Sequence, residues 1–258
     1  MVFDSHAHLD NIKFSEDREE VIARAREAGI VGIINAGACM QSSASSIKLA
    51  EEHDFIYAAV GVHPHDAKDL KAGDYEQLAE WTKHPKVVAV GEIGLDYYYD
   101  LSPREIQKQV FISQLDIARQ TGMPIIIHDR DAHGDILEII KKEAKGLTGV
   151  FHCFSGSMEM MREVIKLGFY VAFGGSVTFK NSAKLPAIAA AVPIERLLFE
   201  TDCPYLTPQP HRGKRNEPAY VNIVTEHVAG LREMTMAELS AVTTANVKRL
   251  FTKIGNKC

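Results

Sequence analysis

The chain has 258 residues, of which 46% are hydrophobic and 24% are charged, and its formal net charge is −5. This composition is typical of a soluble globular protein and excludes an intrinsically disordered chain. The longest apolar runs are too short to cross a membrane, and Asp4 and His6 interrupt any secretory signal, so we expect no membrane association and a cytoplasmic location. The negative charge argues against a protein that grips long duplex DNA through many phosphates.

Apolar segments of strand length alternate with segments of helical period along the whole chain. In chain order they are strand 2–10, helix 16–28, strand 30–35, helix 42–53, strand 56–63, helix 74–83, strand 87–95, helix 103–120, strand 123–128, helix 135–145, strand 149–154, helix 158–167, strand 169–174, helix 182–191 and strand 197–201, followed by helices 218–231 and 236–253. Most of these strands are apolar without alternation, as expected for strands buried on both faces of a parallel sheet. Eight such units predict one α/β domain over residues 1–258, a (β/α)₈ TIM barrel with an extra C-terminal helix.

Polar residues lie at or near the carboxyl ends of six of these strands, where an apolar residue is expected. They are His6, His8, His63, Glu92, His128, His152 and Asp202. In a barrel these strand ends meet at one face, which is where the catalytic groups of this fold gather. A single buried histidine is more often a hydrogen-bonded core residue than a metal ligand, but burying so many polar groups together is costly without a cation. The pattern therefore favours a metal site.

The cysteine spacing and the absence of nucleotide-binding motifs argue against disulfide bonds and against an organic cofactor. Cys39, Cys153, Cys203 and Cys258 are scattered without a pairing pattern, so we expect reduced thiols. Cys153 and Cys203 directly follow proposed ligands, and strand alternation should turn them away from the metal. No glycine-rich dinucleotide or phosphate-loop motif follows the first strand, so we expect no organic cofactor. The sequence leaves the oligomeric state open.

Six motifs together carry a family resemblance over essentially the whole chain. They are FDSHAHLD at 3–10, GEIGLD at 91–96, PIIIH at 124–128, HCFSG at 152–156, ETDCP at 200–204 and RGKRNEP at 212–218. In these the chain resembles the TatD family of metal-dependent deoxyribonucleases and related hydrolases, within the amidohydrolase superfamily. The resemblance implies two divalent cations, one held by His6, His8 and Asp202, the other by His128 and His152, with Glu92 bridging them.

The implied chemistry is hydrolysis by a metal-activated water, with Glu92 and Asp202 as catalytic residues. Asp202 would orient the attacking hydroxide and take its proton. Four histidines favour zinc, manganese or nickel, whereas the nuclease activity of the family is associated with magnesium, so only a divalent metal is predicted. The leading hypothesis is a 3′-to-5′ exonuclease on short or single-stranded DNA ends. The alternative is a small-molecule ester, lactone or amide hydrolase that uses the same binuclear site, and a binding protein with a vestigial site is a third possibility.

Substrate contacts are expected from a second group of polar residues. The basic loop after the last strand, together with two residues nearer the metals, is predicted to position phosphate, and these candidates are Arg212, Lys214, Arg215, Arg130 and His63. A solvated basic loop is the simpler reading of such a charge run. Tyr97, Tyr98 and Tyr99 either stack on a base or only pack the barrel lid, and the sequence does not decide between these roles.

Overall fold

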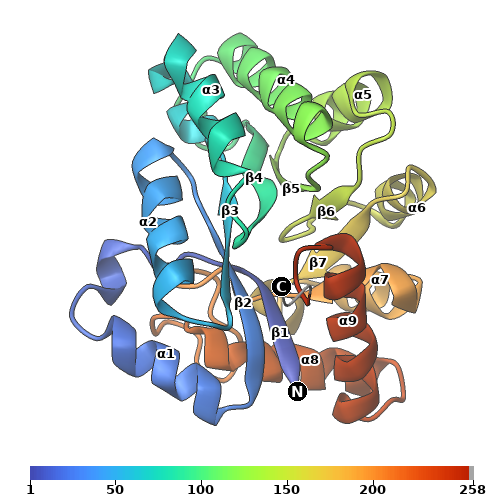
Figure 1. The fold of residues 1–258 in the computed structure, drawn as a ribbon. Coiled ribbons are helices and arrows are strands. Elements are labelled where there is room, and N and C mark those ends of the chain that lie inside the picture. Colours follow the sequence, from blue (N-terminus) through green and yellow to red (C-terminus); the bar gives the residue numbers. More distant parts are fainter. Residues whose placement is uncertain (256–258) are drawn as a thin grey trace.

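Eight parallel strands follow one another in sequence order around a barrel, with the helices outside (Figure 1). The computed structural model describes residues 1–255. The strands are β1 (Val2–Ala7), β2 (Ile30–Ala36), β3 (Ile56–Val60), β4 (Val87–Asp96), β5 (Ile125–Arg130), β6 (Gly149–Phe151), β7 (Tyr170–Phe173) and β8 (Leu197–Phe199). The helices are α1 (Arg18–Glu27), α2 (Met40–Glu52), α3 (Ala72–Trp81), α4 (Arg104–Thr121), α5 (His133–Glu143), α6 (Met158–Lys166), α7 (Leu185–Ala191), α8 (Val221–Leu231) and α9 (Met236–Leu250). The predicted (β/α)₈ barrel is confirmed.

The barrel closes between its first and last strands at the end that carries the predicted ligands. The backbone N–H of Asp202 donates to the carbonyl of His6 at 2.9 Å, and the N–H of His8 donates to the carbonyl of Cys203 at 2.8 Å. These bonds lie beyond the last residue of β8, where Ala7 and Cys203 form an isolated parallel bridge. The seam of the barrel and the proposed metal site are therefore built from the same backbone segments.

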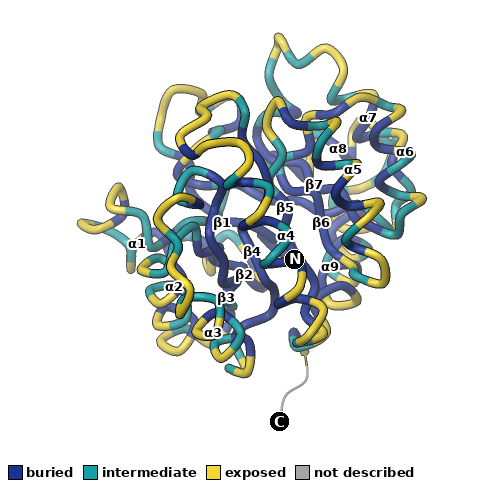
Figure 2. The backbone as a smooth tube through the Cα atoms, turned by 90° about the horizontal axis from the view of Figure 1, so that it is seen from above, coloured by how far each residue is buried: buried dark blue, intermediate teal, exposed yellow. Residues whose placement is uncertain are grey.

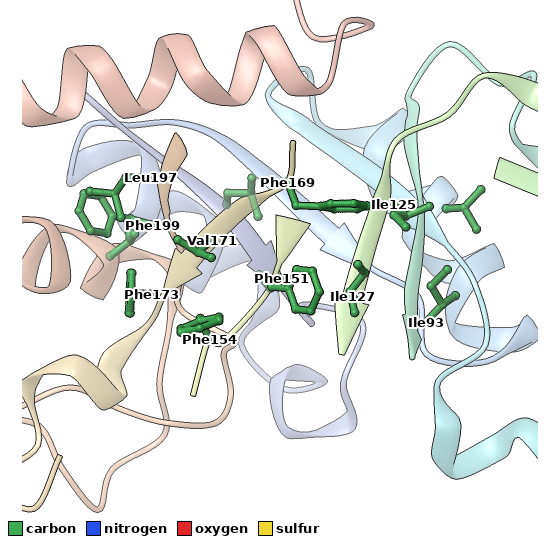
Figure 3. Packing of buried hydrophobic residues seen from close by; sticks show 14 of the residues in the cluster. Ile93, Ile125, Ile127, Phe151, Phe154, Phe169, Val171, Phe173, Leu197 and Phe199 are labelled. Carbon is green, nitrogen blue, oxygen red and sulfur yellow. The ribbon is translucent and has the colours of Figure 1, made fainter. Parts of the chain in front are cut away.

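Burial explains why the strands lack alternation. All ten residues of β4 are buried, and the strands run as a dark core inside partly exposed helices (Figure 2). Figure 3 shows apolar side chains of β5 to β8 packed together. Within this layer Phe151 and Phe169 meet edge to face, with ring centroids 5.8 Å apart. Such packing on both faces of a sheet requires apolar residues at consecutive positions.

The helix boundaries follow local sequence signals. α4 begins directly after Pro103 and ends at Gly122, whose φ of 69° is the left-handed conformation that glycine adopts most easily. α9 begins with a capping box in which Thr235 and Glu238 bond to each other's backbone N–H groups. Among residues 1–255, no helix combines the length and the apolar character needed to span a membrane.

Candidate metal centre

His6 and His8 project from the end of β1 toward two carboxylates that come from other parts of the barrel. Their Nε2 atoms lie 3.1 Å apart. The Nε2 of His6 is 3.3 Å from Oε2 of Glu92, and that of His8 is 3.5 Å from the same oxygen. Oδ1 of Asp202 lies 3.7 Å from Nε2 of His6 and 3.4 Å from Nε2 of His8. Four donor atoms thus converge on one point.

A second group of donors converges on the other oxygen of Glu92. Oε1 lies 2.7 Å from Nδ1 of His128 and 2.8 Å from Nε2 of His152. These two ring nitrogens are 3.3 Å apart. Glu92 is 3% exposed and stands between the two histidine pairs. The structure therefore brings together all six residues that the sequence singles out as ligands.

Four of the predicted site residues, His8, His63, His152 and Asp202, lie beyond their strands rather than in them. His63 follows β3 by three residues and caps a short 3₁₀ helix, Pro64–Asp69, with its Nδ1. His152 follows the end of β6, and Asp202 lies three residues past β8 with a φ of 55°. In the barrel these residues occupy short loops, so period-two alternation does not govern where their side chains point.

The prediction that strand alternation turns Cys153 away from the site is also wrong. Because β6 ends at Phe151 and Cys153 has a φ of 44°, alternation does not turn the Cys153 thiol away from its neighbours. Its sulfur lies within 4.8 Å of donor atoms of His152 and Glu200. Cys203 is fully buried, and Cys258 lies outside the described residues.

The electrostatics of the site are those of a coupled, buried cluster. Burial alone would raise the pKa of Glu92, but the nearby rings of His152, His63 and His6 hold it well below its usual value. Burial lowers the pKa of His8, yet the hydrogen bond with Asp202 and the charge of Glu92 outweigh it and raise the value to about 9. The Glu92 carboxylate is therefore ionised at neutral pH.

The donor set fits divalent cations. A tetrahedral shell with metal–nitrogen bonds near 2.0–2.1 Å places neighbouring donors roughly 3.3 Å apart. The spacings of 3.1 Å between the rings of His6 and His8, and of 3.3 Å between those of His128 and His152, are close to this value. Two imidazole nitrogens that face each other so closely share at most one proton, and a cation satisfies both lone pairs. The geometry thus suits divalent cations, with Glu92 within reach of both histidine pairs.

Outer partners orient the ligand rings, as is usual around protein metal sites. Nδ1 of His8 lies 2.9 Å from the carbonyl oxygen of Ala36. Nε2 of His128 bonds to Oδ2 of Asp96 at 3.0 Å. Nδ1 of His152 faces Oε1 of Glu200 at 3.5 Å, which is an ion-pair contact rather than a hydrogen bond. Within the described residues, Nδ1 of His6 has no hydrogen-bond partner.

Four polar residues of the site were not singled out from the sequence. Asp96 bonds to His65 and His128, and the buried Asp4 accepts from the backbone N–H and hydroxyl of Thr201. Glu200 accepts from the N–H of Cys153. Asp4, Asp96 and Glu200 all stand inside the motifs at 3–10, 91–96 and 200–204, and this proximity to predicted ligands is the sequence signal that points to them. His65 carried the weaker signal of following His63 by two residues.

The residues predicted to contact substrate differ in how close they lie to the metal centre and in whether their side chains are already paired. His63 is buried, with its Nε2 3.5 Å from Oε1 of Glu92, so it stands at the metal centre. Arg130 is exposed at the end of β5. Arg215 forms two hydrogen bonds with Asp17, at 2.7 and 2.6 Å, on the side of α1. Its guanidinium is thus already engaged.

The rest of the basic loop is also partly engaged. The guanidinium of Arg212 stacks on the ring of Phe179 at 3.7 Å. Lys214 is exposed, and its carbonyl accepts from the hydroxyl of Thr207 at 2.5 Å. Gly213 has a φ of 90°, which provides the tight turn between the two cations. The loop is anchored, and Lys214 is its least engaged cation.

The tyrosine segment divides into two roles. Tyr97 is half-buried, donates its hydroxyl to Asp135 at 2.7 Å and lies under the guanidinium of Arg104. It packs the loop above β4, as one of the two readings expected. Tyr98 and Tyr99 are 59% and 53% exposed, and the guanidinium of Arg130 lies 4.1 and 4.7 Å from their ring centroids.

Several known proteins are similar to this chain in sequence and fold over nearly its full length. A metal-dependent hydrolase of uncharacterised activity, YabD of Bacillus subtilis, is 49% identical over 97% of this chain and 99% of its own length. The 3′-5′ ssDNA/RNA exonuclease TatD of Escherichia coli K12 is 37% identical over 97% of this chain and 98% of its own. The crystal structure of YJJV, a TatD homologue from Escherichia coli K12, superposes with a TM-score of 0.91 at 31% identity, covering 97% and 98% of the two chains.

The sequence resemblance is thus confirmed at the level of the family. Residues 3–252 match the family described as TatD related DNase, a range that includes every residue of the metal centre. The converging histidines and carboxylates supply groups that could bind metals. The chain belongs to the TatD family and is a metal-dependent hydrolase.

Proposed function

We propose that this hydrolase is a deoxyribonuclease that trims short or single-stranded DNA from the 3′ end. The observation that carries the proposal is the position of Glu92, whose two carboxylate oxygens face two different histidine pairs. A carboxylate placed in this way could be shared by two cations, and a pair of cations is the arrangement used for in-line displacement at phosphorus. The 3′-to-5′ polarity and the single-stranded substrate follow the name of the Escherichia coli relative.

Each side chain has a role in this proposal. His6, His8 and Asp202 would hold one divalent ion (Mg, Mn, Zn or Ni), His128 and His152 would hold a second, and Glu92 would contribute to both sites. When bound, the ions supply a water acidic enough to ionise near neutral pH and stabilise charge on the phosphoryl oxygens.

Asp202 orients the attacking water and accepts its proton. Burial would raise the pKa of this carboxyl, but the hydrogen bond with His8 and the charge of His152 lower it, so Asp202 is ionised and able to act as a base. His63 lies within reach of the same centre and contacts a phosphoryl oxygen. Arg130 and Lys214, both exposed, are the cations best placed to hold neighbouring phosphates.

A second candidate is a hydrolase of small esters, lactones or amides. Pairing of Arg215 with Asp17 and stacking of Arg212 on Phe179 favour it, because both guanidinium groups are then less available to a phosphate backbone. With ions bound, the same water would attack a carbonyl carbon instead of phosphorus, and Asp202 would accept its proton in the same way.

One assay separates the two candidates. Metal-reconstituted protein is incubated with 3′- or 5′-end-labelled single-stranded DNA, with an aryl phosphodiester and with a lactone series. We expect stepwise shortening of the DNA from its 3′ end and slow turnover of lactones. Apo protein and Glu92→Gln, purified identically, control for contaminating nuclease and should be inactive. Rapid lactone hydrolysis with intact DNA would reverse the assignment.

A further inference from the structure

The exposed aromatic side chains of this protein are concentrated at the face that carries the metal centre. Within residues 1–255, the exposed tyrosine, phenylalanine and tryptophan side chains are Tyr98, Tyr99 and Tyr205, at 59%, 53% and 45%. Tyr98 and Tyr99 follow the end of β4, and Tyr205 follows Asp202 by three residues. The remaining large aromatic rings pack into the interior or against the helices. An exposed ring contributes little to the core. Several exposed rings gathered at the face of the metal centre therefore indicate a surface that binds a ligand.

The backbone that carries each exposed ring is anchored to the ligand set. The Oδ1 atom of Asp96 accepts the backbone N–H groups of Tyr98 and Tyr99 at 3.0 and 2.8 Å, while Oδ2 of the same carboxylate accepts from His128. On the other side, the N–H of Tyr205 donates to the carbonyl of Asp202 at 2.9 Å. The segment of Tyr98 and Tyr99 is thus anchored beside His128 and that of Tyr205 beside Asp202, and the two segments follow different strands of the barrel.

Each side also pairs aromatic surface with a cation. The guanidinium of Arg130 covers Tyr98 and Tyr99, and the ammonium of Lys13 lies 4.9 Å from the centroid of Tyr205. The ring of Tyr99 meets His65 edge to face at 5.4 Å, and the ring of Tyr205 meets His8 at 6.3 Å. Flat π surface beside positive charge matches the chemistry of a nucleotide, which joins a planar base to an anionic phosphate.

We propose that Tyr99, supported by Tyr98 and Arg130, and Tyr205, supported by Lys13, are two stacking sites for the nucleobases on either side of the scissile phosphodiester. This inference rests on the proposed nuclease function and adds a specificity determinant to it: the enzyme holds single-stranded nucleic acid through its bases. Duplex DNA keeps its bases stacked on one another, so it presents no free base face to these rings.

The test compares ends with and without a base. Two single-stranded oligonucleotides of identical sequence are used, one intact and one with a tetrahydrofuran residue replacing each nucleoside that flanks the terminal phosphodiester. We expect the wild-type enzyme to cleave the intact end about tenfold more efficiently in kcat/KM. Tyr99→Leu and Tyr205→Leu should lose most of this preference, chiefly through KM. Tyr99→Phe and Tyr205→Phe should keep it, because stacking needs the ring and not the hydroxyl.

Leu101→Ala is the matched control, since Leu101 is 52% exposed in the same segment but carries no ring. A binding readout complements the kinetics: 2-aminopurine at the terminal position should be quenched by the Asp202→Asn protein and less quenched when Tyr99→Leu is added. If no oligonucleotide is cleaved at all, the proposed function fails. If intact and base-free ends are cleaved equally and the leucine variants match Leu101→Ala, the stacking sites are overturned while the nuclease stands.

Discussion

Asp96 and His128 are joined by a hydrogen bond of 3.0 Å between Oδ2 and Nε2, which leaves Nδ1 of the same ring 2.7 Å from Glu92. The carboxylate of Asp96 is completely buried. Burial would raise its pKa, but the bonds from His128 and His65 hold the value far below normal, so it is an anion. A buried anion on the far nitrogen fixes the ring orientation and increases its basicity toward a cation.

Asp96→Asn should therefore weaken metal binding without unfolding the protein. Loss of an outer partner of a ligand histidine typically costs about 10–100-fold in metal affinity. We expect chelator competition to show one site weakened by this amount and the other nearly unchanged. Asp69→Asn, an exposed charge change on the neighbouring 3₁₀ helix, should bind as the wild type does. Two sites of unaltered affinity in Asp96→Asn would contradict the positioning role.

Metal binding should release protons at neutral pH. Burial lowers the pKa of His8, but Asp202 and Glu92 raise it to about 9, and His128 is likewise raised by Asp96 and Glu92. A ring with a raised pKa carries a proton at pH 7 in the metal-free protein, and that proton must leave before the lone pair binds a cation. The affinity should rise with pH until about pH 9, and the proton release should shrink over the same interval.

Calorimetric titration of the apo protein in two buffers of different ionisation enthalpy measures this release. Asp202→Asn removes the hydrogen bond that raises the pKa of His8, so it should release fewer protons at pH 7. Binding enthalpies that are identical in the two buffers would rule out the protonated apo site.

Gly94 holds β4 close to β5 beside the metal centre. Its φ is 148°, and an added Cβ would lie 2.0 Å from the carbonyl oxygen of His128. Gly94→Ala should destabilise the protein by at least about 2 kcal/mol, because neither backbone can yield without moving a ligand. Thermal melting and metal content should fall together. Gly73→Ala in α3 should instead raise the melting temperature slightly, since its Cβ meets open space among the described residues.

The sequence was sufficient to predict the barrel, and to predict that six polar residues meet at one end of it, because both depend on local patterns. Unalternated apolar strands identify a buried parallel sheet, and polar residues near the carboxyl ends of six strands stand out against it. The assignment of these residues as metal ligands comes from the family resemblance and stays a prediction. The loop residues were harder to place. The path of the chain after β8 depends on the left-handed conformation of Asp202 and on hydrogen bonds between segments nearly 200 residues apart, such as that between Thr201 and Asp4. Spacing along the sequence does not encode such contacts.

Arg215 is another residue whose contacts the sequence spacing does not reveal. Its sequence context indicates a phosphate contact, whereas in the structure it pairs with Asp17 and stacks on Phe14 at 4.6 Å. The pair is about one-third exposed, so solvent screens it, and Arg215→Ala should cost about 1 kcal/mol of unfolding free energy.

The exposed neighbour Lys214 should respond in the opposite way. Lys214→Ala should leave the unfolding free energy unchanged and raise KM for oligonucleotides, because its ammonium makes no ion pair or hydrogen bond with residues 1–255. Arg215→Ala should leave KM nearly unchanged once the protein is folded. Urea unfolding and steady-state kinetics on both variants distinguish these roles. A large rise in KM for Arg215→Ala at unchanged stability would mean that its guanidinium leaves Asp17 for the substrate, and would return Arg215 to the phosphate-binding group.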